Sequence, residues 1–94
     1  MDIKWLNKFL KNLDEEAEYI ALDNPLAARN TVYKIKSTVD LLANNPSLGR
    51  PGRIHGTREL VIDKLPYIIP YRVHNNKIEI LLVFHTSRKP PGSW

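Results

Sequence analysis

The chain has 94 residues, 43% of them hydrophobic, which is enough for one small domain with about one layer of helix on one sheet. It contains no cysteine, so disulfides, thiolate nucleophiles and cysteine-ligated zinc sites are excluded. The formal net charge of +4 is unevenly divided, because residues 1–48 carry a net charge of −1 and residues 49–94 carry +5. A basic second half favours an acidic partner, nucleic acid or protein, although a solvated basic face explains the same bias equally well.

Targeting and metal-binding signals are both missing from the sequence. No apolar run approaches the roughly 20 residues of a membrane span, and the N-terminal residues have scattered charges without a small-residue cleavage site. We therefore expect a cytoplasmic protein that does not enter membranes. His55, His74 and His85 are too far apart in the chain to suggest a metal site.

The N-terminal half predicts a short strand followed by a helix. Ile3 to Trp5 reads as an extended segment, a candidate edge strand. From Leu6 to Ala21, apolar residues recur at steps of three and four, which is typical of one buried helix stripe. They are Leu6, Phe9, Leu10, Leu13, Ala17, Ile20 and Ala21. The acidic residues of this helix are expected on its solvated outer face rather than as a catalytic pair; they are Asp14, Glu15, Glu16 and Glu18.

A second helix is expected from Pro25 to about Asn44. Asn24 suits the N-cap position and Pro25 suits the first helical position. The apolar series that follows steps by 4, 3, 4 and 3 residues, as in a helix packed against a near-antiparallel neighbour. It consists of Ala28, Val32, Ile35, Val39 and Leu42. The two helices should therefore form a hairpin.

The segment 48–56 contains three glycines and offers Arg50, Arg53 and His55 to solvent. It has neither of the glycine patterns of phosphate-binding loops. We therefore interpret it as a connector between helix and sheet rather than as a phosphate cradle.

Three antiparallel strands are predicted next: Thr57–Ile62, Tyr67–His74 and Lys77–His85. A two-residue turn at Asn75-Asn76 fixes the register of the last two strands, because paired residue numbers must then sum to 151. One face of the sheet is then apolar throughout and should pack on the helices. Its members are Leu60, Ile62, Tyr67, Ile69, Tyr71, Val73, Ile78, Ile80, Leu82 and Phe84. The fold class expected is α+β, a helical hairpin on one face of a small antiparallel sheet.

The opposite face of the sheet is the candidate interface. Arg72 should pair with Glu79 across the strands, and Pro70 should bend the middle strand, where a ladder hydrogen bond is lost. Because both helices are committed to the other side, the apolar centre of this face is expected to be exposed and to bind a partner. The candidate contact residues are Val61, Ile68, Pro70, Arg72, Leu81, Val83 and, beyond the sheet, Trp94.

His85 and Arg88 lie near the end of the last strand. A histidine can transfer protons near neutral pH and an arginine can bind a phosphate, so the pair could cleave RNA by activating a ribose 2′-hydroxyl. Arg53 or Arg58 could assist on the phosphate, and Trp94 could stack on a base. An incidental role is the simpler interpretation of a lone histidine and arginine.

Several blocks in order resemble the RelE/ParE superfamily of bacterial toxins from type II toxin–antitoxin modules. They are DNPLAARNTVYKI, LGRPGR, GTRELVI, PYIIPYRV and ILLVFHTSR, and they span nearly the whole chain. The resemblance implies a helical hairpin on an antiparallel sheet, no cofactor, and a cognate antitoxin that wraps the toxin. It also implies that operator DNA is contacted mainly through the antitoxin.

The superfamily contains two activities. RelE-type members cut messenger RNA in the ribosomal A site with a basic cluster on the sheet, whereas ParE-type members poison DNA gyrase. The positions that match this cluster hold Glu59, Val61 and Ile68, while Arg88 matches its last arginine and Trp94 a C-terminal tyrosine. His85 could replace the cluster, as a histidine does in some relatives of the nuclease branch. The missing basic residues favour the ParE-like branch. A ribosome-dependent endoribonuclease, or a toxin-like fold without toxicity, remain the alternatives.

Overall fold

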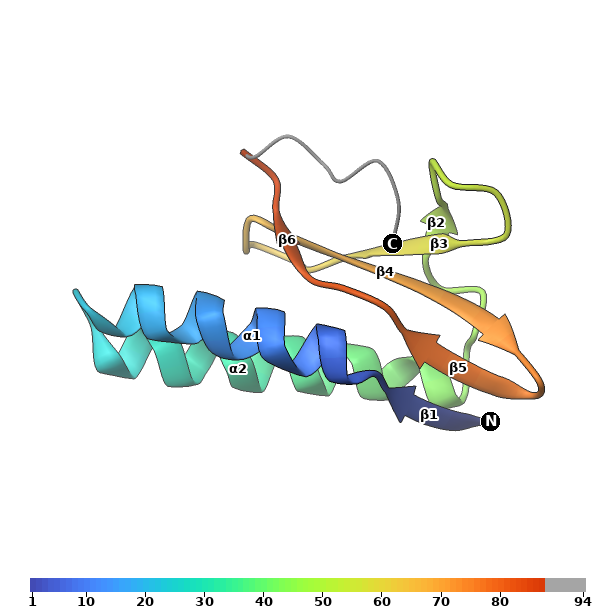
Figure 1. Cartoon of the computed structure of the whole chain (residues 1–94), viewed down its shortest axis with the longest axis horizontal. Helices are drawn as coiled ribbons and strands as arrows, with labels where there is room; N and C mark the ends of the chain where they lie inside the picture. Colours follow the sequence, from blue (N-terminus) through green and yellow to red (C-terminus); the bar gives the residue numbers. More distant parts are fainter. Residues whose placement is uncertain (88–94) are drawn as a thin grey trace.

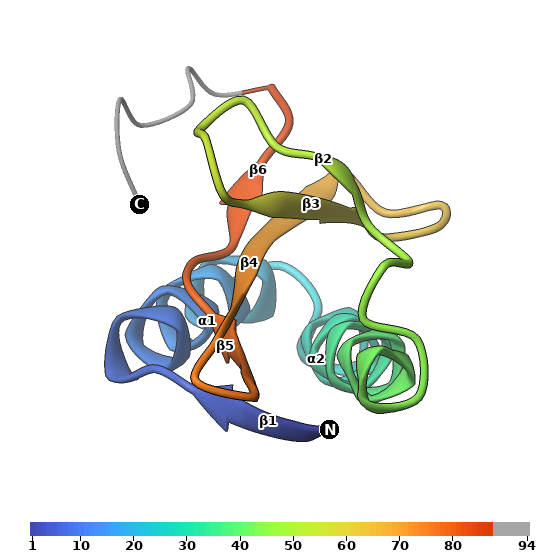
Figure 2. The ribbon, with the colours of Figure 1, turned by 90° about the vertical axis from the view of Figure 1, so that its right-hand side faces the viewer.

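The computed structural model describes residues 1–87 and has an α+β architecture, as predicted (Figure 1). Two helices lie side by side against one face of a twisted sheet (Figure 2). The elements, in chain order, are β1 (Asp2–Trp5), α1 (Asn7–Ala21), α2 (Pro25–Asp40), the 3-10 helix η1 (Leu41–Ala43), β2 (Arg50–Pro51), β3 (Arg58–Val61), β4 (Tyr67–His74), β5 (Lys77–Ile80) and β6 (Phe84–His85). Within the described part of the chain, no helix has the length and apolar character needed to cross a membrane.

The start of α2 confirms the predicted capping. The Asn24 Oδ1 accepts a hydrogen bond from the backbone N–H of Ala27 at 3.1 Å, and Pro25 occupies the first helical position. Both features satisfy or remove N–H groups that would otherwise lack an intrahelical partner. The α-helix ends at Asp40, and the tighter turn of η1 continues it to Ala43. The predicted end near Asn44 therefore includes a final turn of 3-10 geometry.

Helix α1 buries Phe9 and Leu13 as predicted, but it also buries Glu16. The expectation that Glu16 lies on the solvated face with the other acids is therefore wrong. Positions 9, 13, 16 and 20 step by 4, 3 and 4 residues, so Glu16 falls on the stripe that faces the sheet. Asp14, Glu15 and Glu18 are exposed, as expected.

The sheet is mixed rather than wholly antiparallel. Its order is β1-β5-β4-β3-β2, and β6 pairs with β4 on the side where β5 also pairs. The segment predicted as an edge strand is β1, which runs parallel to β5 with Ile3 beside Ile78. The other pairings are antiparallel. The first and last thirds of the chain therefore meet at one edge of the sheet.

The hairpin of β4 and β5 has the predicted turn and register. Asn75 and Asn76 have φ values of 52° and 59°, the left-handed conformation that a tight two-residue turn requires. Arg72 faces Glu79, and the Arg72 Nε donates to the Glu79 Oε1 at 2.6 Å. The predicted cross-strand ion pair is confirmed.

The predicted register fails after Ile80. In β6, Phe84 pairs with Ile68 and His85 pairs with Tyr67, so the paired numbers sum to 152 instead of 151. The slip begins at Pro70. Its carbonyl accepts a hydrogen bond from the Leu81 N–H at 3.0 Å, but proline has no N–H to donate a second bond in the opposite direction. Ladder pairing stops there, as expected for proline, and resumes one residue out of step.

Because a one-residue slip reverses which face each side chain occupies, three assignments are corrected. Val83 belongs to the main core, whereas Leu82 and Phe84 belong to a smaller cluster with Ile68 and Leu81. The main core lies between the helices and the sheet, and most of its predicted members are confirmed. It consists of Phe9, Leu13, Ile35, Val39, Leu42, Leu60, Ile62, Tyr67, Ile69, Tyr71, Ile78, Ile80 and Val83.

Tyr71 anchors the connector between η1 and β2. Its buried hydroxyl accepts from the Gly49 N–H at 2.8 Å and donates to the Pro46 carbonyl at 2.7 Å. A Cβ atom at position 49 would lie 2.6 Å from the Tyr71 ring, so only glycine fits this close approach. The connector that carries Arg50 and Arg53 is therefore attached to the middle strand of the sheet.

Candidate functional site

The outer face of the sheet is the face turned away from the helices, and most of its apolar centre is buried. Ile68, Pro70 and Leu81 are buried there, and Val83 has turned into the main core. The expectation of an exposed apolar patch is therefore wrong for these four residues. Val61 is 51% exposed, and the Arg72 side chain is 47% exposed. The parts of this face open to a partner are thus its polar rim and Val61.

A cluster of Glu59, Arg50 and Arg53 occupies the β2–β3 end of the outer face. The Glu59 Oε1 accepts from the Arg50 Nη2 at 3.3 Å. The Glu59 Oε2 accepts from the Arg53 backbone N–H at 3.1 Å and from the Arg53 Nε at 3.4 Å. We call these three residues the Glu59 cluster. The position at which a basic residue would mark the nuclease branch therefore holds an acid that is hydrogen-bonded to two arginines.

The Glu59 cluster stabilises the charged form of its carboxyl group. Burial by itself raises the pKa of Glu59, but the hydrogen bonds from Arg53 and Arg50 and the charge of Arg53 outweigh it and hold the pKa below the ordinary 4.5. Across the same face, the hydrogen bond from Arg72 likewise lowers the pKa of Glu79. Both carboxylates therefore remain ionised near neutral pH.

These two shifts predict a loss of stability in acid. A carboxyl group whose folded pKa is depressed stabilises the fold above its unfolded pKa, near 4.5, and that contribution disappears as pH falls through the folded value. Unfolding by urea at a series of pH values from 7 downward should show this decline below about pH 5. Glu59→Gln should make the decline shallower by removing the Glu59 part and leaving that of Glu79, whereas Glu18→Gln on the exposed surface of α1 controls for the general loss of one negative charge. An unchanged profile in Glu59→Gln would contradict the assignment.

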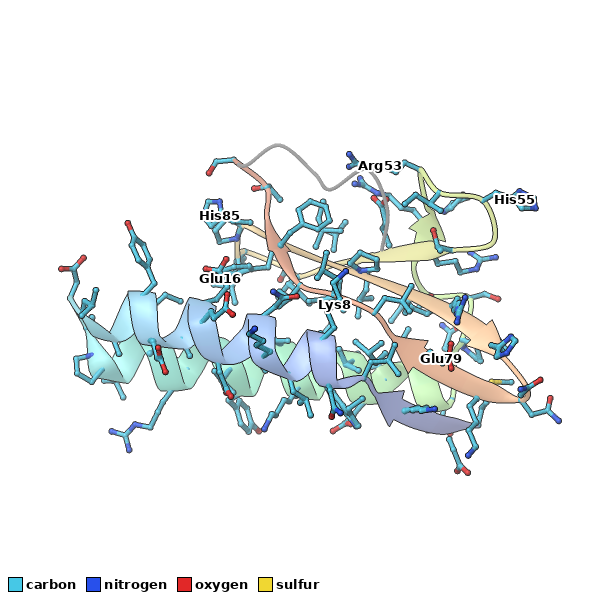
Figure 3. All side chains as sticks on the ribbon, in the orientation of Figure 1. Lys8, Glu16, Arg53, His55, Glu79 and His85 are labelled. Carbon is cyan, nitrogen blue, oxygen red and sulfur yellow. The ribbon has the colours of Figure 1, made fainter. Side chains whose placement is uncertain are left out.

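A separate cleft of about 470 Å³ surrounds His85 on the helix side of the sheet. The His85 ring meets the Tyr67 ring edge-on at 5.4 Å, and the His85 Nδ1 accepts from the Ser87 backbone N–H at 3.1 Å. Neutral His85 therefore carries its proton on Nε2. The lining residues are Glu16, Tyr19, Ile20, Thr31, Leu65, Pro66, Tyr67, His85 and Ser87. Figure 3 shows His85 on the side of Glu16, away from Arg53.

Among residues 1–87, the structure does not bring together the predicted catalytic residues His85, Arg53 and Arg58. His85 faces the helices, while Arg53 lies on the outer face, where its guanidinium carbon is 5.7 Å from the centre of the Phe84 ring. Arg58 instead donates to the Gly49 carbonyl at 2.8 Å and to the Ser47 carbonyl at 3.5 Å, so it holds the connector. The predictions for Arg88 and Trp94 lie outside the described residues.

Two features of the site region were missed by sequence reasoning. Glu16 lines the His85 cleft, and its place on the buried stripe of α1 was the signal that could have found it. The second feature is an apolar groove of about 510 Å³ on the helix hairpin. Its lining consists of Ala17, Glu18, Ala21, Pro25, Ala28, Arg29 and Val32. Three of these residues are alanines, and their short side chains on two neighbouring helices leave room for such a groove.

The comparisons with known proteins agree with one another. The model of the ParE toxin of the type II toxin–antitoxin system parDE matches residues 3–90. The Y4kP protein of Sinorhizobium fredii is 48% identical over 89 residues, which cover 95% of this chain and 92% of that protein. Toxin RelE2 of Caulobacter vibrioides is 33% identical over 86 residues, covering 92% of this chain and 96% of the relative.

A solved structure shares the same fold. It is described as the chromosomal ParDE TA system from P. aeruginosa, and its similar chain is 32% identical with a TM-score of 0.81. The similarity covers 90% of this chain and 95% of that chain. The order of helices and strands described above is therefore that of a known toxin–antitoxin component.

Proposed function

Because this chain belongs to the ParE toxin family of type II toxin–antitoxin systems, we propose that it arrests growth by poisoning DNA gyrase and that it does so without cutting RNA. The family implies a cognate antitoxin that neutralises the toxin. Since gyrase acts on the chromosome, the toxin would work in the cytoplasm.

The Glu59 cluster is the main support for the gyrase branch. A basic cluster that binds and cleaves RNA needs free cations facing the phosphate. Here Arg50 and Arg53 are engaged by a carboxylate, and Val61 and Ile68 at the neighbouring positions carry no charge. His85 opens into a cleft on the other side of the sheet. This separation argues against a shared acid–base and phosphate-binding site.

Two surfaces suit the antitoxin. The apolar groove between α1 and α2 can accept the apolar side of a helix, and the rim of the outer face offers Val61 and Arg72 to an extended acidic segment. Ile68, Pro70, Leu81 and Val83 are buried, so they would support this rim rather than contact the antitoxin directly.

Ribosome-dependent mRNA cleavage is the second candidate. Its support is the 33% identity with toxin RelE2 and the presence in one cleft of His85, Tyr67 and Ser87, which could handle protons. In this alternative His85 is the general acid or base.

Induction of the toxin alone separates the two candidates. We expect growth arrest with gyrase-dependent DNA breaks, intact messenger RNA, and rescue by co-expression of the antitoxin. His85→Ala should arrest growth as strongly as the wild type, and so should His55→Ala, a matched change in the exposed connector. Circular dichroism of each variant checks that the fold is kept. Codon-positioned mRNA cuts without DNA breaks, lost in His85→Ala and kept in His55→Ala, would show the nuclease instead.

A further inference from the structure

We propose that Arg50 and Arg53 form an oxyanion site of the phosphate-binding class, and that Glu59 fills this site as an internal anion. In the folded toxin, Glu59 would thereby exclude phosphate groups from the outer face of the sheet. Neither candidate activity uses Arg50 and Arg53 as a phosphate site, so Glu59 would fill it whether gyrase or messenger RNA is the target.

The donors of the Glu59 cluster have the arrangement of an anion-binding site. Two guanidinium groups and one backbone N–H direct three hydrogen bonds, of 3.1 to 3.4 Å, at the two carboxylate oxygens. Phosphate and carboxylate oxygens accept the same charge-assisted hydrogen bonds from arginine. A backbone N–H directed at the same oxygen adds a fixed partial positive charge. The donor set therefore suits an oxyanion in general and is not particular to a glutamate side chain.

The exposed fractions of the three side chains show that Glu59 is the enclosed group and that the two arginines surround it. The Glu59 side chain is 3% exposed, whereas those of Arg50 and Arg53 are 55% and 44% exposed. The arginines thus form an open rim over an enclosed anion. Because two guanidinium groups face one carboxylate, the net charge of the cluster is +1. Without the Glu59 carboxylate it would be +2. By contrast, Glu79 on the same face is held by a single arginine, Arg72.

The loop that carries the donors has hydrogen bonds of its own. The Gly52 N–H donates to the Thr57 carbonyl at 2.8 Å, and the Thr57 hydroxyl donates to the Ile54 carbonyl at 2.6 Å. A Cβ atom at position 52 would lie 2.3 Å from the Thr57 Oγ1, so the loop is closed tightly around a glycine. None of these bonds involves Glu59. The Arg53 N–H should therefore keep its direction when the carboxylate is removed.

Vacating the site tests the proposal. Glu59→Thr removes the carboxylate and keeps a residue that favours strands. Inorganic phosphate is then added at constant ionic strength while NMR follows the Arg53 backbone amide. We expect phosphate to bind Glu59→Thr at least about tenfold more tightly than the wild type, because one added charge-assisted bond corresponds to roughly that factor. The double variant Arg53→Ala/Glu59→Thr should lose this gain.

A matched control and a second ligand complete the test. Glu79→Thr vacates a carboxylate held by one arginine on the same face and should bind phosphate no better than the wild type. A fluorescent single-stranded oligonucleotide, measured by anisotropy, tells whether the vacated site also accepts a phosphodiester. Binding of either ligand by Glu59→Thr alone supports the proposal. A folded Glu59→Thr that binds neither ligand, or that equals Glu79→Thr, overturns it.

Should Glu59→Thr be too unstable for NMR but still show a thermal unfolding transition, its Tm gives the same answer. A ligand that binds only the folded state raises Tm, so phosphate should stabilise Glu59→Thr more than it stabilises Glu79→Thr. The comparison between variants cancels the general stabilising effect of phosphate salts. Equal shifts in the two variants would also overturn the proposal. Growth arrest is not a readout here, so a failure of the gyrase assignment leaves this result intact.

Discussion

Replacing Phe9 with alanine should lower the free energy of unfolding by about 3–5 kcal/mol, the usual cost of removing a buried aromatic side chain and leaving a cavity. Phe9 is fully buried between α1 and the sheet, and its ring centre is 5.6 Å from that of Trp5. Since small domains are stable by only about 5–15 kcal/mol, this one change would remove a large part of the total. Thermal unfolding should shift down by more than about 12 °C.

Tyr19→Ala is the matched control for Phe9. It removes an aromatic side chain from the same helix, at a position that is mostly exposed. Its effect should stay within about 1 kcal/mol, as for most surface substitutions. Equal losses in the two variants would mean that Phe9 does not contribute as a core residue.

Tyr71→Phe should cost about 2–3 kcal/mol although it removes one oxygen atom. The hydroxyl lies in the core and bonds both the Gly49 N–H and the Pro46 carbonyl, so its loss leaves a buried donor without its partner. Burial raises the pKa of the Tyr71 phenol above 10.0, so the hydroxyl keeps the proton with which it donates a hydrogen bond to the Pro46 carbonyl. Urea unfolding measures the change in free energy, and amide exchange at Gly49 should accelerate.

Tyr33→Phe provides the comparison for Tyr71→Phe. Tyr33 is exposed on α2, so the same atom is removed where water can replace its hydrogen bonds. We expect almost no change in stability. If Tyr71→Phe were equally harmless, Tyr71 could not be the anchor of the connector.

Local chemistry was sufficient to predict the helices and the tight hairpin. Asn24 and Pro25 mark the start of α2 because a helix needs a cap there, whatever it packs against. Asn75 and Asn76 fix the register of β4 and β5 because few residues accept positive φ. Both signals act within a few residues of the structure that they determine.

The strand after Leu81 could not be placed by the same arithmetic. The register rule assumes an unbroken ladder, and Pro70 breaks it from the neighbouring strand. The proline predicted that strand pairing would be interrupted, but not how many residues the interruption would span. Pairing resumes at Phe84, and that point depends on how Leu82 and Val83 pack on the two sides of the sheet. As a consequence of the slip, His85 lies on the helix side of the sheet.

The candidate site was harder to predict than the fold for a related reason. Glu59 meets Arg50 and Arg53 only because the connector folds back along β3, and no periodic pattern describes that path. Glu16 could have been found, since it lies on the apolar stripe of α1, but acids were assigned to the surface by residue type. For Glu16, the position on the helix predicts burial better than the residue type does.

The pairing of β1 with β5 sets an order of events during protein synthesis. Residues 2–5 emerge from the ribosome long before residues 77–80, with which they pair. At about 5–20 residues per second, β1 waits roughly 4–15 s for its neighbour. The α1–α2 hairpin needs only residues 7–40 and can form during that interval. We therefore expect the nascent chain to hold a finished hairpin with an open apolar side, and to close its sheet only after residues 77–80 have been synthesised.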